Sequence, residues 1–403
     1  MTQATDRTFA SARHSSDTRL IASVSAAHFV SHFYMLVLPP LFVFVRADYG
    51  VSYTELGLAL TVLNVVSAVL QTPAGFLVDR GDAKLVLIAG VLCGAAGFAI
   101  AALVDSYWVL VAMFALIGVG NTVYHPADYA ILSHRVAPER VSQAYSVHTF
   151  SGMLGGAAAP LSVLFMHSLF GWRGAFLGAA VLGIAVAALL YLQRGTPEHG
   201  GAGPKGGSDS GADWKLLLSP PILVSFLFFM LISVANFGLL FYCVVALNAL
   251  YGTAAVTANS ALSANLLFSA CGVLLGGLIA SRTTRHGLVA ALGLAASAAA
   301  AIVLGLFDPG AVLLVVLMSL GGLASGLVMP SRDMIVRAVT PPGAFGKVFG
   351  FVTNGFNIAG MLAPLIFGAL MDHGAPRTVF FLIGACSLAA VATVMSATRR
   401  RTA

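Results

Sequence analysis

The residues of this chain best suited to chemistry are histidines and one aspartate inside apolar segments. His125 and Asp128 stand three residues apart in the run VGNTVYHPAD, and His28 and His32 stand four apart in an earlier apolar run. Residues three or four apart share one face of a helix, and a charge at membrane depth is costly unless it faces water or a partner. Because histidine changes charge near neutral pH, these four residues and His148 are the predicted proton-coupling set.

The same spacings also suit a divalent metal ion bound by imidazole and carboxylate ligands. No metal-rich loop accompanies them, so neither a metal nor another cofactor is expected. A lone histidine inside a membrane is often only a hydrogen-bonded core residue, but the grouping of several histidines with an acid favours a functional role. A membrane receptor or an intramembrane enzyme is the alternative from another class. No nucleophile with a paired base and no phosphate loop supports it, so the protein is not expected to be an enzyme.

The segment around Asp128 has a counterpart in the second half of the chain, which indicates an internal duplication. Its stripe of Gly118, Asn121, His125 and Asp128 is matched by Gly322, Ser325, Met329 and Arg332. The symmetry of such repeats places Asp128 and Arg332 on opposite walls of a central cavity, and we expect them to pair as a gate when the cytoplasmic side is closed. The rival roles for Arg332 are to clamp an anionic substrate or to be neutralised by Asp333.

The composition is that of an integral membrane protein. Hydrophobic residues make up 59% of the 403 residues and charged residues only 9%, with a mean hydropathy of +0.93, which is too little polar surface for a soluble globule of this length. The four cysteines stand alone in apolar runs, so no disulfide framework or thiolate metal site is expected. The basic residues are scattered between apolar segments, which argues against nucleic acid as a partner.

The apolar runs predict an all-α protein with 12 transmembrane helices, since about 20 helical residues cross the hydrocarbon layer. A Gly- and Pro-rich linker over 194–219 divides them into two six-helix bundles, 20–193 and 220–398, between a tail over 1–19 and a basic tail over 399–403. The predicted starts are Leu20, Thr54, Lys84, Trp108, Ser142, Gly174, Pro221, Ala258, Gly287, Gly310, Lys347 and Pro376.

The distribution of basic residues predicts the orientation. Nearly all lysines and arginines fall in alternate loops on one side, and the exceptions are Arg46, Arg173, Arg377 and the intramembrane Arg332. Basic loops stay in the cytoplasm. Both termini are therefore expected to be cytoplasmic, in a multi-pass protein of the inner membrane.

Two parallel six-helix halves with a long linker resemble the major facilitator superfamily. In that family the loop after the second helix carries Gly-x-x-x-Asp-Arg followed by basic residues, matched here by Gly75, Asp79, Arg80 and Lys84, with Asp82 where a glycine of the motif would stand. Asp79 is expected to meet the positive end of a helix or an arginine of another loop, and with Arg80 to latch the cytoplasmic side. Plain loop solvation is the alternative.

A narrower resemblance rests on AHFVSHF, VGNTVYHPAD and SQAYSVHTFSG, which look like the fosmidomycin-resistance branch of that superfamily. His125, Pro126 and Asp128 match its His-Pro-acid element, with the acid one place late, whereas Ser31 and His32 replace its Asn-Asp. The resemblance implies a proton-coupled exporter, an antiporter, of a small drug or metabolite. An importer of a small carboxylate or metal chelate is the alternative.

The superfamily fold also implies which side chains line the central cavity. The partners expected are a small-molecule substrate, protons and the lipid bilayer, and the protein is expected to be a monomer. Glycines and a proline in the fifth helix, among them Gly152, Gly155 and Pro160, predict a close helix seam, with plain packing as the alternative. The expected substrate-binding residues are His32, Asn121, Tyr124, His125, Asn236, Arg332, Asn354 and Asn357.

Overall fold

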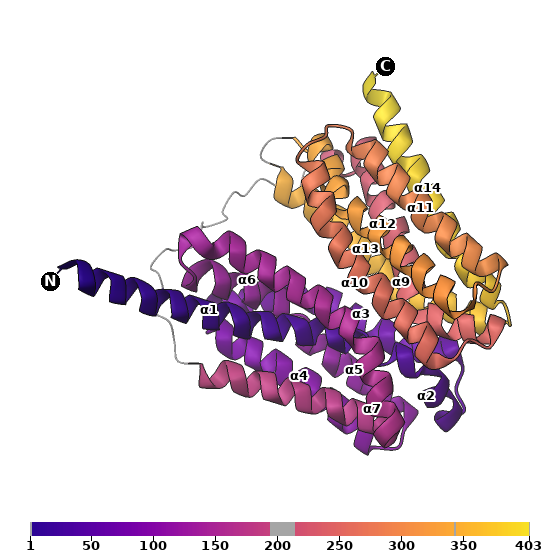
Figure 1. Cartoon of the computed structure of the whole chain (residues 1–403), viewed down its shortest axis with the longest axis horizontal. Helices are drawn as coiled ribbons and strands as arrows, with labels where there is room; N and C mark the ends of the chain where they lie inside the picture. Colours follow the sequence, from indigo (N-terminus) through magenta and orange to yellow (C-terminus); the bar gives the residue numbers. More distant parts are fainter. Residues whose placement is uncertain (1, 194–213, 342–343, 403) are drawn as a thin grey trace. The chain divides into compact units, whose positions relative to one another are not determined.

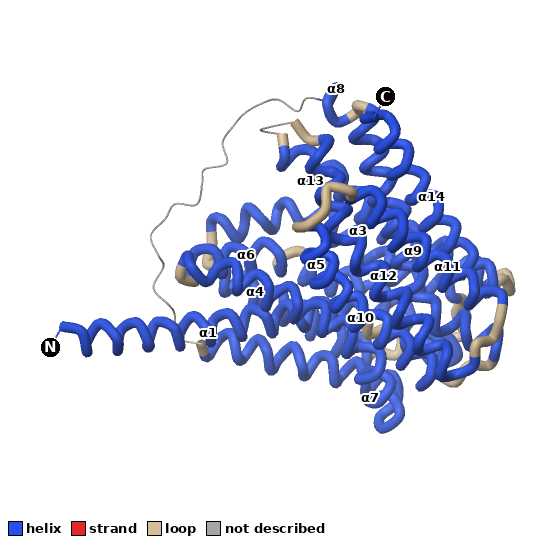
Figure 2. The backbone as a smooth tube through the Cα atoms, turned by 45° about the horizontal axis from the view of Figure 1, so that its top comes forward, coloured by secondary structure: helices blue, strands red, loops and turns tan. Residues whose placement is uncertain are grey.

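The computed structural model describes residues 2–193, 214–341 and 344–402. Most of the predicted linker (194–219) therefore lies outside the described residues, as do residues 1 and 403 of the two tails. Within the described ranges every regular element is a helix (Figure 2), which confirms the all-α prediction.

The elements of the described residues are labelled in Figure 1. They are α1 (Thr2–Met35), η1 (Pro39–Leu41), α2 (Phe42–Tyr49), α3 (Tyr53–Arg80), α4 (Ala83–Leu103), α5 (Tyr107–Asn121), α6 (Tyr124–Arg135), η2 (Pro138–Arg140), α7 (Val141–Leu192), α8 (Trp214–Leu217), α9 (Pro220–Tyr251), α10 (Ala255–Ala280), α11 (His286–Leu306), α12 (Gly310–Val339), α13 (Phe345–Asp372) and α14 (Pro376–Thr402).

Eleven stretches of the described residues are long and apolar enough to cross a membrane. One of them, Pro138–Leu192, has 55 residues and so accommodates two spans of about 20 residues each. The break lies at Gly171 in α7, whose φ of 71° is open to glycine but strained for other residues. The twelve predicted spans are thus recovered: the fifth and sixth are the two helices that meet at Gly171 under the label α7, and the fourth is split into α5 and α6.

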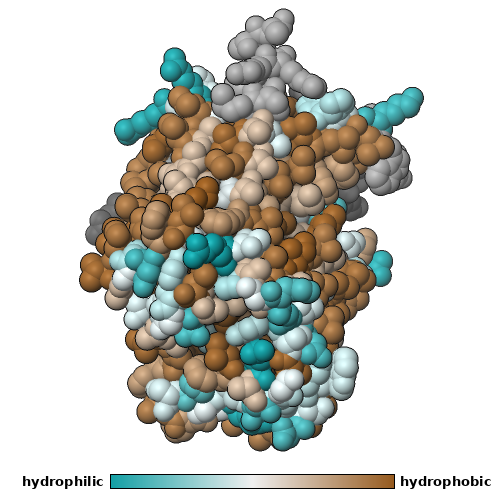
Figure 3. All heavy atoms as spheres, turned by 90° about the vertical axis from the view of Figure 1, so that its right-hand side faces the viewer, coloured by the Kyte–Doolittle hydropathy of each residue, from teal (hydrophilic) through white to brown (hydrophobic). Residues whose placement is uncertain are grey.

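The surface agrees with a lipid environment. Large apolar residues such as Leu103, Leu192 and Val312 expose more than two thirds of their surface. Hydrophobic residues cover much of the face shown in Figure 3. Such a surface is stable only where lipid replaces water around it.

The chain divides into two compact units. Unit 1 comprises Met1–Val37, Val65–Gly156 and Met166–Gly207, and unit 2 comprises Leu38–Asn64, Ala157–Phe165 and Ser208–Ala403. In unit 1, α4 packs on α5 and α6, and α1 packs on α6. In unit 2, α10 packs on α12, while α9 packs on both α13 and α14. The predicted bundle limits at 20–193 and 220–398 stay a prediction.

Small residues allow several of these helix pairs to approach closely. A Cβ on Gly90 would clash with Val123, and one on Gly322 would clash with the carbonyl of Asn265. Without water to drive apolar association, close backbone packing of this kind holds helices together in lipid. The core of unit 2 combines aromatic and aliphatic side chains, among them Phe228, Phe229, Leu294, Val328 and Val352.

Candidate functional site: a buried histidine and aspartate cluster

The centre of the candidate site is a pair formed by Asp128 of α6 and His148 of α7. The Asp128 Oδ2 and His148 Nε2 atoms are 2.9 Å apart, and both side chains are fully buried. The chain turns sharply between these helices at η2, so two residues twenty positions apart face each other. A carboxylate and an imidazole in such contact can share one exchangeable proton: the net charge of the pair is zero with that proton and −1 without it, when the imidazole is neutral.

His28 of α1 extends the pair on its other side. Its Nδ1 lies 2.8 Å from the backbone carbonyl oxygen of His148, and its ring stacks on that of His148 with centroids 3.7 Å apart. A carbonyl only accepts hydrogen bonds, so Nδ1 of His28 donates, and Nε2 offers a lone pair whenever the ring is neutral. In the described structure His28 Nε2, Asp128 Oδ1 and His148 Nδ1 are buried without a hydrogen-bond partner.

Two further histidines join His28. The ring centroids of His32 and His125 lie 4.7 Å and 5.3 Å from that of His28. His125 is exposed, His32 is half-buried, and His28 is buried. The structure therefore brings all the residues of the predicted proton-coupling set into one cluster of unit 1, which grades from an exposed imidazole to a fully buried acid.

Close packing of α1 on α7 builds this cluster. A Cβ at Gly152 would lie 2.5 Å from Cε1 of His28 and 2.9 Å from Cδ2 of His32, and one at Gly155 would meet the backbone of Phe29. One turn away, the Ser151 hydroxyl donates to the Ser25 carbonyl over 2.8 Å. The glycines of α7 leave the space that the two histidine rings occupy.

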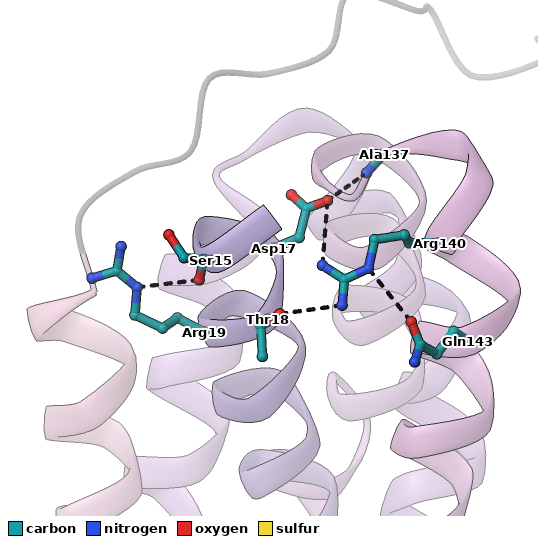
Figure 4. A network of polar contacts seen from close by, with 7 residues as sticks. All are labelled: Ser15, Asp17, Thr18, Arg19, Ala137, Arg140 and Gln143. Atoms are coloured by element: carbon teal, nitrogen blue, oxygen red, sulfur yellow. Dashed lines mark hydrogen bonds and ion pairs between the residues drawn. The ribbon is translucent and has the colours of Figure 1, made fainter. Parts of the chain in front are cut away.

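A second polar network, missed by sequence reasoning, joins α1 to the turn between α6 and α7 (Figure 4). Asp17 of α1 is buried; its Oδ2 accepts a hydrogen bond from the Ala137 amide over 3.2 Å and lies 3.9 Å from Arg140. Arg140 also donates to the Thr18 hydroxyl over 3.2 Å. The only signal in the sequence was one acid in a polar tail, which is typical of a solvated residue.

Asn121 and Tyr124, both expected to bind substrate, lie beside the cluster. The Asn121 amide donates to Ser67 over 3.2 Å, and the Ser67 hydroxyl donates to the Gly118 carbonyl over 3.1 Å. Tyr124 is buried in the core of unit 1. Ser67 was not singled out by the sequence, because an isolated serine in an apolar helix carries no pattern.

The remaining predicted binding residues belong to unit 2. The Arg332 Nε donates to Asp333 over 2.9 Å, and the guanidinium carbon lies 4.3 Å from the centre of the Phe229 ring. Arg332 thus faces α9 rather than lipid and has the acidic neighbour that the sequence suggested. Asn236 is exposed on α9, and Asn357 donates to Asn354 over 3.3 Å on α13. The pairing of Asp128 with Arg332 stays a prediction.

The last turn of α3 holds the two residues of the predicted cytoplasmic latch. Asp79 and Arg80 are exposed, and their gating role stays a prediction. The neighbouring Asp82 caps α4 by accepting hydrogen bonds from Lys84 N and Leu85 N over 2.8 Å and 3.4 Å. Within the described residues no set of three or more His, Cys, Asp or Glu side chains is arranged to hold a metal ion.

Comparisons with known proteins identify the family. The Major Facilitator Superfamily model matches residues 24–285 and 230–403. An uncharacterized MFS-type transporter of Bacillus subtilis is 25% identical over 88% of this chain and 86% of its own length. The fosmidomycin resistance protein of Escherichia coli is 21% identical over 93% of this chain and 92% of its own. The fold resembles that of an inward-facing bacterial homologue of the human lysosomal transporter Spinster, with a TM-score of 0.79, 15% identity, and coverage of 95% of this chain and 97% of that one.

Proposed function

Because the chain belongs to the major facilitator superfamily, we propose that it is a secondary transporter of the inner membrane that exports a small, anionic drug or metabolite in exchange for protons. That it is a multi-pass membrane transporter follows from the family and its apolar spans. Export is supported by relatives named for resistance to fosmidomycin and to multiple drugs, the latter 31% identical over 28% of this chain.

The observation that carries proton coupling is the graded cluster of unit 1. His125 is exposed, His28 presents an unpartnered Nε2, and Asp128 and His148 form a buried pair. In this proposal a proton enters at the exposed ring and ends on the buried pair. Because His28 Nδ1 is bonded to the His148 carbonyl, transfer past His28 requires its ring to turn or a water molecule to intervene. A proton-coupled antiporter requires a site that takes up and releases one proton as the site is alternately exposed to water and shielded from it.

Substrate binding in this proposal uses the polar residues of unit 2 and those beside the cluster. Arg332 is held in one orientation by Asp333 and by the Phe229 ring, and a fixed planar guanidinium suits a carboxylate or phosphonate. Asn236, Asn354, Asn357, Asn121, Tyr124 and His32 would complete the site. Gating by Asp79, Arg80 and the Asp128–Arg332 pair, action as a monomer and cytoplasmic termini belong to the same proposal.

Flux in proteoliposomes tests it, with fosmidomycin, the antibiotic in the relative's name, as the probe. We expect a pH difference across the membrane to drive fosmidomycin toward the acidic side, and expression in sensitive cells to raise their tolerance. Accumulation on the alkaline side, together with greater sensitivity of the cells, would instead indicate proton-coupled import. Flux that is independent of pH would remove the coupling role of the cluster.

A further inference from the structure

The ring of Tyr129 lies where α6 and α7 meet, beside the buried pair. On α6, His125 and Tyr129 stand four residues apart, and on α7, Tyr145 and His148 stand three apart, so each two share a helix face. The centroid of the Tyr129 ring lies 5.5 Å from that of His148, 5.1 Å from that of Tyr145 and 6.3 Å from that of His125. The four rings form one aromatic array, in which Tyr129 contacts the other three.

Tyr129 is also the exposed neighbour of the pair. In the part of the chain that the structure describes, two rings contact that of His148: His28 is 4% exposed and Tyr129 is 43% exposed. Asp128 and His148 themselves are fully buried. Because Tyr129 directly follows Asp128 in α6 and packs on His148, its ring stands between the pair and the surface.

The surface on which Tyr129 lies is polar. The exposed residues of α6 are His125, Tyr129, Ser133 and His134, and each of them can form hydrogen bonds. Other helices of unit 1 instead expose large apolar residues, such as Leu103 at the end of α4. A face of the composition found on α6 suits water rather than lipid. Tyr129 therefore separates a buried acid from a wet surface.

The pair would bind water if water could reach it. Asp128 Oδ1 and His148 Nδ1 are buried and have no hydrogen-bond partner within the described residues, and an unpartnered buried polar atom is costly. The barrier that keeps water from these atoms is therefore steric. Ring contacts such as those of Tyr129 are individually weak and are readily broken and remade, so its side chain can turn aside and return.

We propose that Tyr129 is a positioning residue of the proton site: its ring covers His148 and keeps water from the Asp128–His148 pair until the side chain turns aside. Its role in transport rests on the proton coupling proposed above, whereas the covering of the pair does not. The ring alone provides the cover, so the hydroxyl is dispensable. The other titratable groups around the pair are His28 and His32 of α1, Tyr124 and His125 of α6, and Tyr145 of α7.

Chemical modification of His148 tests the cover in the full-length protein. Diethyl pyrocarbonate acylates the unprotonated nitrogen of an imidazole that it can reach, and mass spectrometry of the peptides gives a rate for each histidine. In Tyr129→Ala, we expect His148 to react about tenfold faster than in the unsubstituted protein, the factor for a covered arrangement favoured by about 1.4 kcal/mol. Tyr129→Phe keeps the ring, so His148 should react as slowly as in the unsubstituted protein.

Matched variants separate a cover from a general loss of structure. Phe150→Ala removes a ring of α7 that is equally exposed, at 43%, and that contacts none of the rings of the cluster in the described structure, so it should leave the rate at His148 unchanged. The rate at His134, which is exposed on α6, should stay the same in every variant. If His148 reacts as slowly in Tyr129→Ala as in the unsubstituted protein, or if Phe150→Ala speeds its reaction equally, the cover is refuted.

A second substitution decides if Tyr129→Ala does not fold. Tyr145→Ala removes the ring that packs edge-on against Tyr129 at 5.1 Å. The loosened Tyr129 should uncover His148 more often, so the reaction should again be faster. An unchanged rate at His148 in a folded Tyr145→Ala protein would then count against the cover.

Transport in proteoliposomes distinguishes this inference from the proposed function. At a given pH difference, Tyr129→Ala should accumulate less fosmidomycin than Tyr129→Phe, because protons that reach an uncovered pair out of turn dissipate the gradient. Equal accumulation by these two variants would refute the positioning role in coupling. If flux in the unsubstituted protein is independent of pH, the proton coupling fails, and the modification rates still decide whether Tyr129 covers the pair.

Discussion

Replacing Asp128 with asparagine should uncouple substrate movement from the proton gradient while preserving the fold. Asparagine has nearly the volume of aspartate, and its amide can still bond to His148 across the 2.9 Å contact, but it cannot release or take up a proton. Among the described residues of the cluster, Asp128 is the one carboxylate. Exchange of labelled for unlabelled substrate without a gradient should therefore continue in this variant.

The structure also sets the size of the effect. One buried pair holds one exchangeable proton, so one proton should move per cycle. With the electrical potential held at zero, a difference of one pH unit is worth about 1.4 kcal/mol for one proton, which supports about tenfold accumulation of substrate. In Asp128→Asn the concentrations on the two sides should stay equal at every pH difference.

The assay is uptake into proteoliposomes with equal potassium and valinomycin on both sides, at several pH differences. A plot of the logarithm of the accumulation ratio against the pH difference should have a slope of one. His134→Asn is the matched control, since His134 is an exposed histidine of the same helix α6 outside the cluster. A slope of two in the unsubstituted protein, or an undiminished slope in Asp128→Asn, would refute the assignment of the proton to this pair.

Five other substitutions follow from the same contacts. Gly152→Ala should lower transport and should reduce the free energy of unfolding by about 1–3 kcal/mol, because its Cβ would push on the two α1 histidines. Gly156→Ala should be tolerated, because there is room for its Cβ. Flux and thermal unfolding measure the effects of both substitutions. His148→Ala leaves a buried carboxylate without its partner and should lower stability by about 3–5 kcal/mol, measured by thermal unfolding in detergent. Arg332→Lys should weaken the binding of an anionic substrate about tenfold, because lysine lacks the planar guanidinium, and this should appear as a raised KM. An unchanged KM would exclude a role for Arg332 in binding the anion. Asp17→Asn should destabilise the protein by about 1 kcal/mol through a weaker buried network, measured as a lower Tm.

The sequence was sufficient for the membrane class, the spans and the grouping of the histidines, because each depends on local spacing or on total composition. His28 and His32 share a helix face whatever the partner is, and the second repeat reveals itself by similar residues at matching places. The sequence predicted the fifth and sixth spans from Ser142 and Gly174 but not the residue at which they part, because only the backbone conformation of Gly171 marks the break.

The sequence could not predict contacts between residues that lie far apart in the chain. Asp17 and Asp372 each stand in a polar segment, where an acid is typical of a solvated loop, and only the folded chain shows the amides that they cap. The expectation that Asp79 meets the positive end of a helix or an arginine of another loop stays a prediction. The sequence analysis did not foresee that its neighbour Asp82 accepts a hydrogen bond from an amide at the start of α4.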